Sequence, residues 1–402
     1  MKTHLFVVFA VLKSTSRVTL FVLVLLLIEF LDEFIYGARE AAWPLIRTDL
    51  GLTYAQIGLL LGLPGFVSSV IEPLFGILGD FWKRRVIVLG GGVIFAASLL
   101  LMGTSHNFMW LLLAFVLFSP ASGAFVGLSQ ATLMDVEPAR HEYNMARWTF
   151  AGSVGVVAGP LALSAVIALG LGWRGLFVGF AGLAVVLLIL AWRSPYSNGN
   201  GKAPEHTDIK DSFNEIWQTL RQGAALRWLT LLQFSDLMLD VLLGYLALYM
   251  VDVVDVTPSQ AGTAVAVWTG VGLLGDLLLI PLLKRVPGLR YLQLSAVLEL
   301  LLFPTFLLVP SFVLKLMALA LLGLFNAGWY SILKAQLYSS LPGRSGTVMA
   351  MDNIFGLVGA LIPWGLGLVA QRFDLRVTMW LLLSGPVALL VGLPRRARTD
   401  SA

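Results

Sequence analysis

Cysteine is absent from the 402 residues, and its absence excludes disulfides, thiolate catalysis and cysteine-bound metals. Charged residues are scarce at 12%, whereas soluble domains carry about 25%. The four histidines, His4, His106, His141 and His206, fall in the tail or in loops. Since no catalytic constellation is recognisable, we expect neither an enzyme nor a resident cofactor or metal ion.

Hydrophobic residues make up 58% of the chain, and the mean hydropathy is +0.86. Apolar stretches of about 20 residues recur from end to end, each long enough to cross a hydrocarbon core of about 30 Å. The composition therefore predicts an all-α membrane protein with many spans. The net charge of +4 does not indicate nucleic-acid binding, because the basic residues lie in short loops.

Twelve membrane spans are predicted from the apolar runs. They lie at about 18–43, 54–79, 86–105, 108–133, 143–169, 173–193, 225–251, 258–283, 290–309, 312–339, 346–371 and 375–394. Residues 1–17 carry only eight apolar residues before Lys13, too few to span. We expect this segment to be a short interfacial helix or the product of a misassigned start.

The segment 194–224 is polar and rich in glycine, proline and asparagine, and it reads as a linker. With the N-terminus inside, 19 Lys and Arg fall on the inner side and five on the outer side, so both termini and the linker are predicted to be cytoplasmic. The predicted organisation is a six-helix bundle at 1–193, the linker, a six-helix bundle at 225–394 and a cytoplasmic tail at 395–402.

Residues 25–160 recur faintly 204 positions later. The matched pairs include Phe30/Phe234, Asp32/Asp236, Thr53/Thr257, Gln56/Gln260, Gly58/Gly262, Glu72/Asp276, Gly152/Gly356 and Gly155/Gly359. Six spans per copy is an even number, so both copies enter the membrane in the same direction. Two-bundle secondary transporters have this parallel repeat, with a site between the halves near the midplane.

The first span carries a polar, acidic face within an arc of about 100°, and the seventh span repeats it. A charge at the centre of a membrane helix costs about 2.5–3.5 kcal/mol, which favours a face lining water or contacting partners. Carboxylates in such surroundings can load and release protons near neutral pH. The candidate residues for proton coupling and substrate contact are Glu29, Asp32, Glu33, Tyr36, Arg39, Gln130, Gln233, Asp236, Asp240 and Lys334.

Several of these charges have simpler interpretations. Arg39 most simply pairs with the acids of its own helix, and Glu40 is interpreted as an outer-end residue drawn up to the headgroups. Lys334 is interpreted as a charge partner of the acids in the seventh span, with contact to an anionic substrate group as the alternative. Arg147 is expected to extend its side chain to the inner face of the membrane.

The second span has a face of small residues, which predicts close helix packing. That face comprises Gly58, Gly62, Gly65, Ser69, Glu72 and Gly76. Glu72 and its counterpart Asp276 lie about two turns from the cytoplasm. They are interpreted either as gate residues or as members of a structural ion pair.

The loop after the second span, Gly76-Ile-Leu78-Gly-Asp80-Phe-Trp-Lys-Arg84-Arg85, resembles the loop motif of the major facilitator superfamily. The resemblance implies a cytoplasmic latch between the halves, with Asp135 or Glu137 and the segment 345–347 as partners. A helix N-terminus there would stabilise the motif's carboxylate. The expected gating residues are Glu72, Gly76, Asp80, Arg84, Arg85, Asp135, Asp276 and Asp352.

The fifth span contains Gly155-Val-Val-Ala-Gly159-Pro160, which is similar to the superfamily motif typical of proton antiporters that export drugs. Residues 43–76 most resemble the fosmidomycin-resistance branch. This branch resemblance implies an exporter of small toxic molecules in a bacterial inner membrane.

The leading functional hypothesis is a secondary active transporter that exports a small amphipathic molecule in exchange for protons by alternating access. The alternative is a proton symporter for uptake of a small solute or a lysolipid. A more remote alternative is a membrane receptor that transports nothing. The expected partners are a small-molecule substrate, protons and the lipid bilayer but not nucleic acid, and a monomer is expected to function.

Overall fold

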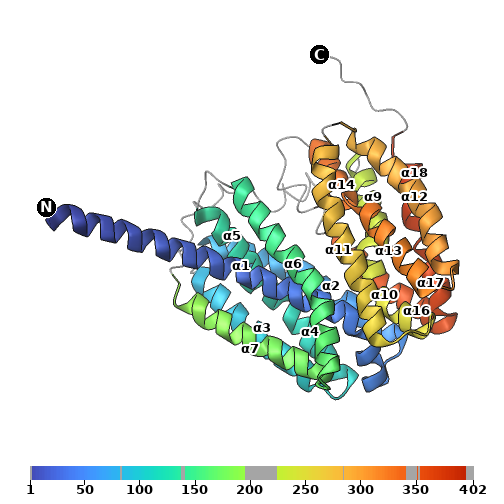
Figure 1. Cartoon of the computed structure of the whole chain (residues 1–402), viewed down its shortest axis with the longest axis horizontal. Helices are drawn as coiled ribbons and strands as arrows, with labels where there is room; N and C mark the ends of the chain where they lie inside the picture. Colours follow the sequence, from blue (N-terminus) through green and yellow to red (C-terminus); the bar gives the residue numbers. More distant parts are fainter. Residues whose placement is uncertain are drawn as a thin grey trace, which may run out of the picture. The chain divides into compact units, whose positions relative to one another are not determined.

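The computed structural model describes residues 2–81, 84–136, 141–194, 224–283, 285–340, 351 and 354–394, and every regular element in these ranges is a helix (Figure 1). The first part of the chain forms α1 (Lys2–Leu50), α2 (Tyr54–Phe81), α3 (Arg84–Thr104), α4 (Phe108–Ser122), η1 (Gly123–Gly127), α5 (Leu128–Val136), α6 (His141–Ala168) and α7 (Gly172–Trp192). The second part forms α9 (Ala224–Asp236), η3 (Leu237–Val241), α10 (Leu242–Asp252), α11 (Pro258–Leu282), α12 (Gly288–Leu308), α13 (Phe312–Asn326), α14 (Trp329–Ser340), α16 (Ile362–Arg372), α17 (Leu375–Leu381) and α18 (Ser384–Gly392).

Eleven helical segments of the described chain are long and apolar enough to cross a membrane. The first predicted span, 18–43, is not among them; it begins where the side chains are outside the described part of the structure. The all-α membrane class is nevertheless confirmed. Residues 2–17 do not form a separate short helix, since α1 runs without a break from Lys2.

Five of the predicted spans contain an irregular turn that the apolar pattern did not predict. Turns at 360–361 and 382–383 interrupt the eleventh and twelfth spans. The fourth span is α4, a π-helical turn η1 and then α5, and the seventh is α9, the π-helical turn η3 and α10. The tenth span is interrupted at Ala327 and Gly328, between α13 and α14. Hydropathy is insensitive to these turns, because the side chains on either side remain apolar.

Capping boxes explain why Thr53 matches Thr257 and Gln56 matches Gln260 in the repeat. Thr257 Oγ1 accepts the N–H of Gln260, whose Oε1 accepts the N–H of Thr257 at 2.9 Å, at the start of α11. Thr53 and Gln56 make the same reciprocal bonds at the start of α2. This arrangement satisfies backbone donors that a helix N-terminus leaves open, so the matched residues fix where the second span of each copy begins.

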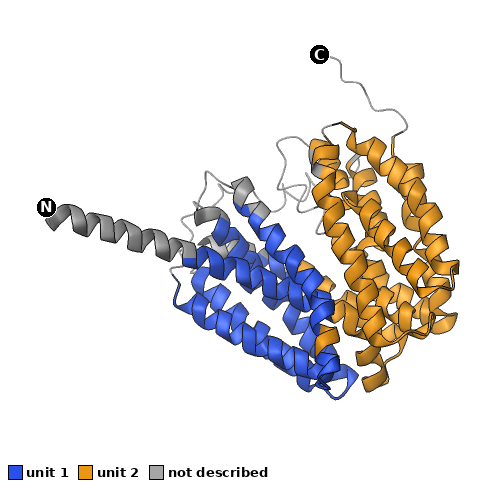
Figure 2. Cartoon of the chain, viewed as in Figure 1, with its two compact units in different colours: residues 1–38, 70–162, 166–203 blue, residues 39–69, 163–165, 204–402 orange. Residues whose placement is uncertain are grey.

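The chain forms two compact units (Figure 2). Unit 1 comprises residues 1–38, 70–162 and 166–203, and unit 2 comprises 39–69, 163–165 and 204–402. The boundaries fall inside α1 and α2, so the outer parts of these helices pack within unit 2. The linker lies almost wholly outside the described residues, and the division into bundles at 1–193 and 225–394 stays a prediction.

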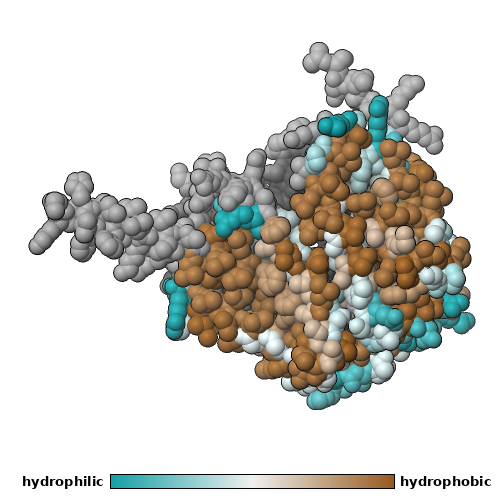
Figure 3. Space-filling view, viewed as in Figure 1, coloured by the Kyte–Doolittle hydropathy of each residue, from teal (hydrophilic) through white to brown (hydrophobic). Residues whose placement is uncertain are grey.

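Large apolar side chains cover much of the face seen in Figure 3, where hydrophobic residues predominate over hydrophilic ones. Examples on the surface of unit 1 are Val93 and Leu183, and on that of unit 2 Leu278 and Leu301, which are 49–65% exposed. Exposed apolar patches of this kind mark a membrane-facing surface.

Within unit 2, the glycines of α2 pack against the segment at Ala360–Gly367. A Cβ at Gly58 would lie 2.5 Å from the Pro363 carbonyl oxygen, and one at Gly62 would overlap the carbonyl oxygen of Ala360. The Tyr245 hydroxyl donates to the Pro363 carbonyl at 2.6 Å and lies beside the same glycine, Gly58. The interpretation of this small-residue face as a packing surface is confirmed for these two glycines.

Candidate functional site

Asp32 is held by a serine from the fourth span. Ser122 Oγ donates to the two Asp32 carboxylate oxygens, at 3.0 Å to Oδ1 and 2.9 Å to Oδ2. Ser122 is the last residue of α4, and the π-helical turn η1 begins at the next residue. Asp32 is half-buried within unit 1. The structure therefore places this acid beside an irregular turn.

The other acids of the first span lie against a glycine of α6. A Cβ at Gly152 would be 2.6 Å from Glu29 Oε1 and 3.1 Å from the Glu33 Cγ. Glu29 is 8% exposed, and Glu33 is half-buried. The absence of a side chain at Gly152 is what leaves room for two carboxylates between α1 and α6.

The antiporter-like glycines continue this contact. A Cβ at Gly155 would lie 2.5 Å from the Phe30 carbonyl oxygen, and one at Gly159 would lie 2.6 Å from the Gly37 carbonyl carbon. Pro160, the next residue, is buried within α6. The motif therefore brings the backbones of α1 and α6 together, directly beside the acidic face.

Glu72 of α2 approaches the same irregular turn from another side. A Cβ at Gly123, the first residue of η1, would lie 2.6 Å from the Glu72 Cγ and 2.9 Å from its Oε1. In unit 1, Asp32 and Glu72 thus contact neighbouring residues of the fourth span, Ser122 and Gly123.

The second copy has a related arrangement, but its π-helical turn lies in the seventh span itself, at positions equivalent to 33–37 of the unbroken α1. Asp236 is the last residue of α9, and the π-helical turn η3 follows it. Asn326 Nδ2 donates to the carbonyl oxygen of Met238 in η3 at 3.0 Å. Gln233, the counterpart of Glu29, lies against Gly359, where a Cβ would overlap its amide oxygen.

Asp276 also contacts the irregular part of its neighbouring span. Its Oδ1 accepts the backbone N–H of Gly328 at 3.2 Å, immediately before α14 begins. Gly328 has φ +76°, in the left-handed region that favours glycine. A carboxylate at a helix N-terminus is stabilised by the helix dipole. The two interpretations of Asp276 are a gate residue and a member of a structural ion pair. Its described hydrogen bond is to a backbone N–H and not to a cation.

The repeat relates the two sites residue by residue. Ser122 and Asn326 are 204 positions apart, as are Ala124 and Gly328. In each copy a polar side chain at the end of one helix bonds to the first span of that copy, and the acid of the second span approaches the turn that follows. The sequence matched the acids but not these partners.

Arg39 pairs with its neighbour in the same helix, as its simplest interpretation predicted. Its Nε and Nη2 both donate to Glu40 Oε1, at 2.8 and 2.6 Å, and Trp43 Nε1 donates to Glu40 Oε2 at 2.9 Å. Glu40 is only 1% exposed. The expectation that Glu40 reaches the headgroups is therefore wrong, because protein donors satisfy both of its oxygens inside unit 2.

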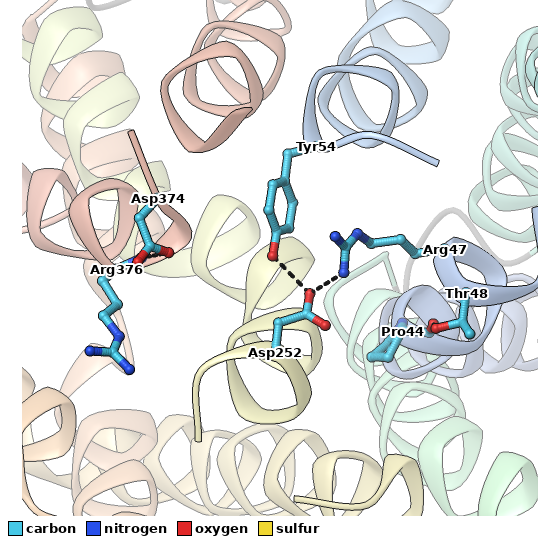
Figure 4. Close-up of polar contacts among 7 residues, drawn as sticks. All are labelled: Pro44, Arg47, Thr48, Tyr54, Asp252, Asp374 and Arg376. Atoms are coloured by element: carbon cyan, nitrogen blue, oxygen red, sulfur yellow. Dashed lines mark hydrogen bonds and ion pairs between the residues drawn. The ribbon is translucent and has the colours of Figure 1, made fainter. Parts of the chain in front are cut away.

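A second charged cluster lies at the ends of α1, α2 and α10 (Figure 4). Asp252 Oδ2 accepts from Arg47 Nη1 at 2.7 Å and from the Tyr54 hydroxyl at 2.9 Å. The Arg47 guanidinium also lies 4.4 Å from the Tyr54 ring centroid. We call Arg47, Tyr54 and Asp252 the outer cluster. It ties the helices of the first two spans to the seventh span within unit 2.

Other predicted residues lie elsewhere in the described chain. Tyr36 and Gln130 are half-buried, and Asp240 is exposed within η3. Lys334 Nζ lies 5.6 Å from the Tyr330 ring centroid on α14. Arg147 is half-buried near the start of α6.

The expected cytoplasmic latch is described only in part. Arg84 is 6% exposed, and Arg85 Nη2 donates to the carbonyl oxygen of Trp192. The backbones of Gly76, Asp80 and Asp135 are helical, but the side chains of these acids lie outside the described part. Glu137, residues 345–347 and Asp352 fall outside the described residues altogether. The latch therefore stays a prediction.

Sequence reasoning missed Ser122, Trp43 and the outer cluster. The polar pair Ser122 and Asn326, which share one repeat position in otherwise apolar spans, was an available signal. Arg47 and Asp252 gave no such signal, because each ends a helix and resembles an ordinary charge in a loop.

Comparison with known proteins places this geometry in a family. The sequence profile of the Major Facilitator Superfamily matches residues 22–363. An uncharacterized MFS-type transporter of Yersinia pestis is 27% identical over 258 residues, 61% of this chain and 62% of that protein. The fosmidomycin resistance protein of Escherichia coli is 28% identical over 182 residues, 44% of this chain and 45% of that protein.

A chloramphenicol resistance protein of Pseudomonas aeruginosa is 33% identical over 156 residues, 38% of this chain and 36% of that protein. The matched stretches thus span less than two thirds of each of these curated relatives.

Two solved structures share the fold. A bacterial homolog of the human lysosomal transporter Spinster superposes with a TM-score of 0.72 at 19% identity, covering 94% of this chain and 95% of that chain. A mutant of the nucleoside transporter NupG superposes with a TM-score of 0.78 at 15% identity, covering 93% and 98%. The all-α chain with its duplicated acids therefore has the major facilitator fold; it belongs to the Major Facilitator Superfamily and is a multi-pass membrane transporter, not an enzyme.

Proposed function

We propose that this transporter exports a small amphipathic or drug-like molecule in exchange for protons, across a bacterial inner membrane. In this proposal the chain works as a monomer by alternating access, with both termini in the cytoplasm. Its two six-helix bundles, at 1–193 and 225–394, supply equivalent acids.

One observation carries the proton coupling. Asp32 and Asp236, which are equivalent in the repeat, are both half-buried, and each lies next to a π-helical turn. Such turns occur mostly as single interruptions of α-helices and are frequent at functional sites. Ionisable residues within membrane spans are costly and mark ion pathways and proton relays. Both arguments point to the same pair of residues.

The driving force is sufficient for the proposed exchange. One proton that moves inward across 100 mV supplies about 2.3 kcal/mol, which is enough for roughly fifty-fold accumulation. Protonation of Asp32 would remove the negative charge that Ser122 now stabilises. Loss of that charge-assisted bond is the step that we assign to coupling in unit 1.

Relatives support the export direction. Two of them are named for resistance to fosmidomycin and chloramphenicol, and a membrane transporter would confer resistance by moving the compound out of the cell. The contacts of Arg39 with Glu40 occupy one of the cations that an anionic substrate could contact; Arg147 and Lys334 are two others in the predicted spans.

Transport in proteoliposomes tests the proposal. The full chain is reconstituted, a pH gradient is imposed in either direction, and chloramphenicol and fosmidomycin are the first probes. We expect gradient-driven movement opposite to the proton flow, and we expect Asp32→Asn and Asp236→Asn to reduce it at least tenfold while the protein still folds.

Asp255→Asn is the matched control. Asp255 is exposed between α10 and α11 with φ +62°, a conformation that asparagine tolerates. It should transport like the unchanged protein. Normal gradient-driven transport by both span variants would contradict proton coupling through these residues, and movement along the proton flow would support symport instead.

A further inference from the structure

Glu299 is a buried acid to which the sequence motifs drew no attention. It lies on α12, whose buried face also includes Ser295, Ala296 and Phe303. Its exposure is 0%, and neither carboxylate oxygen has a hydrogen-bond partner among the described residues. Glu40, an equally buried glutamate, has donors at both oxygens.

No described cation is available to neutralise a charge on Glu299. The helices α13, α14 and α18 pack along α12, and Tyr249 of α10 contacts the end of α12, where the Tyr249 hydroxyl donates to the Leu307 carbonyl oxygen at 3.2 Å. On α13, Lys315 Nζ donates to the carbonyl oxygens of Phe306 and Leu307, at 2.6 and 3.2 Å. By helix rise, Phe306 lies about 10 Å along α12 from Glu299.

The remaining ionisable groups near α12 also lie away from Glu299. On α14, Lys334 lies over the ring of Tyr330, which is 56% exposed and so faces outward. The described residues of α18 include no charged or titratable side chain. On α12 itself, the Tyr291 hydroxyl donates to the Phe325 carbonyl at 3.3 Å, and Arg290 is exposed at the helix start.

An ionised carboxylate without a partner is far more costly to bury than a neutral carboxylic acid, and such a group neutralises itself by taking up a proton. Glu299 also lies one turn from Ser295, whose Oγ accepts a hydrogen bond from Trp329 Nε1 at 2.8 Å. Trp329 is the first residue of α14, directly after the interruption that Asp276 contacts. Movement at this interruption would therefore reach the surroundings of Glu299.

We propose that Glu299 is a proton-binding site of the C-terminal half, separate from Asp32 and Asp236, and that it exchanges its proton with solvent. The ligand is H⁺ itself, taken up from water by the carboxylate and returned to water. The inference deepens the proposed function, because it adds a second proton-carrying group to unit 2.

Infrared spectroscopy of the full chain in lipid nanodiscs tests the site directly. Near neutral pH, the unchanged protein should show the carbonyl band of a protonated carboxylic acid, and Glu299→Gln should lose one component of it. Glu40→Gln is the matched control, because Glu40 is an equally buried glutamate whose two carboxylate oxygens have described donors. After transfer to D₂O, the Glu299 component should shift as its proton exchanges.

Glu299→Met, an apolar replacement of similar size, gives the same readout if the glutamine variant fails to fold. An unchanged band in these variants, or a component that never shifts in D₂O, would overturn the proposal. The readout needs no substrate. If Asp32→Asn and Asp236→Asn do not affect transport, that result counts against the proposed function. It does not alter the conclusion about Glu299, which rests on the infrared band alone.

Discussion

The buried acidic residues of this chain differ in the partners that their carboxylates contact. Glu40 is ion-paired and accepts an indole N–H, Asp32 is held by a hydroxyl, and Glu299 has no partner in the described residues. These differences decide what each group can do. Described donors stabilise the charge on Glu40, whereas no described donor is available to Glu299.

Replacement of Glu40 by glutamine should destabilise the protein. The change leaves the Arg39 guanidinium without its anion inside unit 2, and removal of one partner of a buried ion pair costs about 3 kcal/mol at the lower end of the usual range. We take the lower end because the Arg39 side chain is 19% exposed. Unfolding by SDS in mixed micelles measures the change.

Trp43→Phe is the matched control for that experiment. It removes only one hydrogen bond to Glu40, so its cost should be about 1 kcal/mol. Equal stability of Glu40→Gln and the unchanged protein would contradict the described ion pair.

At the scale of elements, the positions of three of the irregular turns, and not the lengths of the helices, coincide with the contacts of the acids. η1, η3 and the interruption at Ala327–Gly328 lie where the duplicated acids make their contacts. Hydropathy predicted most span boundaries to within a few residues, as for 290–309 against Gly288–Leu308. It gave no indication of these turns, because a π-helical turn alters backbone hydrogen bonding without altering which residues are apolar.

The outer cluster joins the ends of α1 and α10, and a charge exchange tests it. Arg47→Asp and Asp252→Arg should each weaken this contact, whereas the double variant should restore it. The two side chains are 30% and 20% exposed, so solvent screening limits the expected coupling energy to about 0.5–1 kcal/mol. A double-mutant cycle in SDS unfolding measures the coupling.

Tyr54→Phe serves as the control for the cycle. It removes the hydroxyl that donates to Asp252 but retains the aromatic ring beneath Arg47. Additive effects of the two charge reversals, with no recovery in the double variant, would mean that the ion pair does not hold these helices together.

For the whole molecule, the boundary between the two sequence repeats differs from the boundary between the two compact units. The repeat divides the chain near the linker, whereas the compact units divide it inside α1 and α2. The sequence predicted the duplication from Asp32/Asp236 and its neighbours. It did not predict that residues 39–69 pack with the second copy, because side chains such as Arg47 and Gly62 reveal their partners only in three dimensions.

A chain cut within the linker should therefore stay associated. We expect residues 1–193 and 225–402, produced together as separate chains, to co-purify, because the outer parts of α1 and α2 belong to unit 2. Gly62→Leu in the first fragment should weaken co-purification, since a side chain there would overlap the Ala360 carbonyl oxygen.

Gly90→Leu is the control, because a Cβ at Gly90 meets nothing within 4 Å. It should leave recovery of the pair unchanged. If the unchanged fragments separate completely, residues 39–69 do not hold the two chains together.

The continuity of α1 has a mechanical consequence. One unbroken helix contributes its residues up to Ala38 to unit 1 and those from Arg39 onward to unit 2. A helix is stiff along its axis, so a bend near Gly37, where the Val156 carbonyl leaves no room for a side chain, would disturb the packing of α1 within unit 1. The outer end of the same helix is held within unit 2 by the ion pair of Arg47 with Asp252.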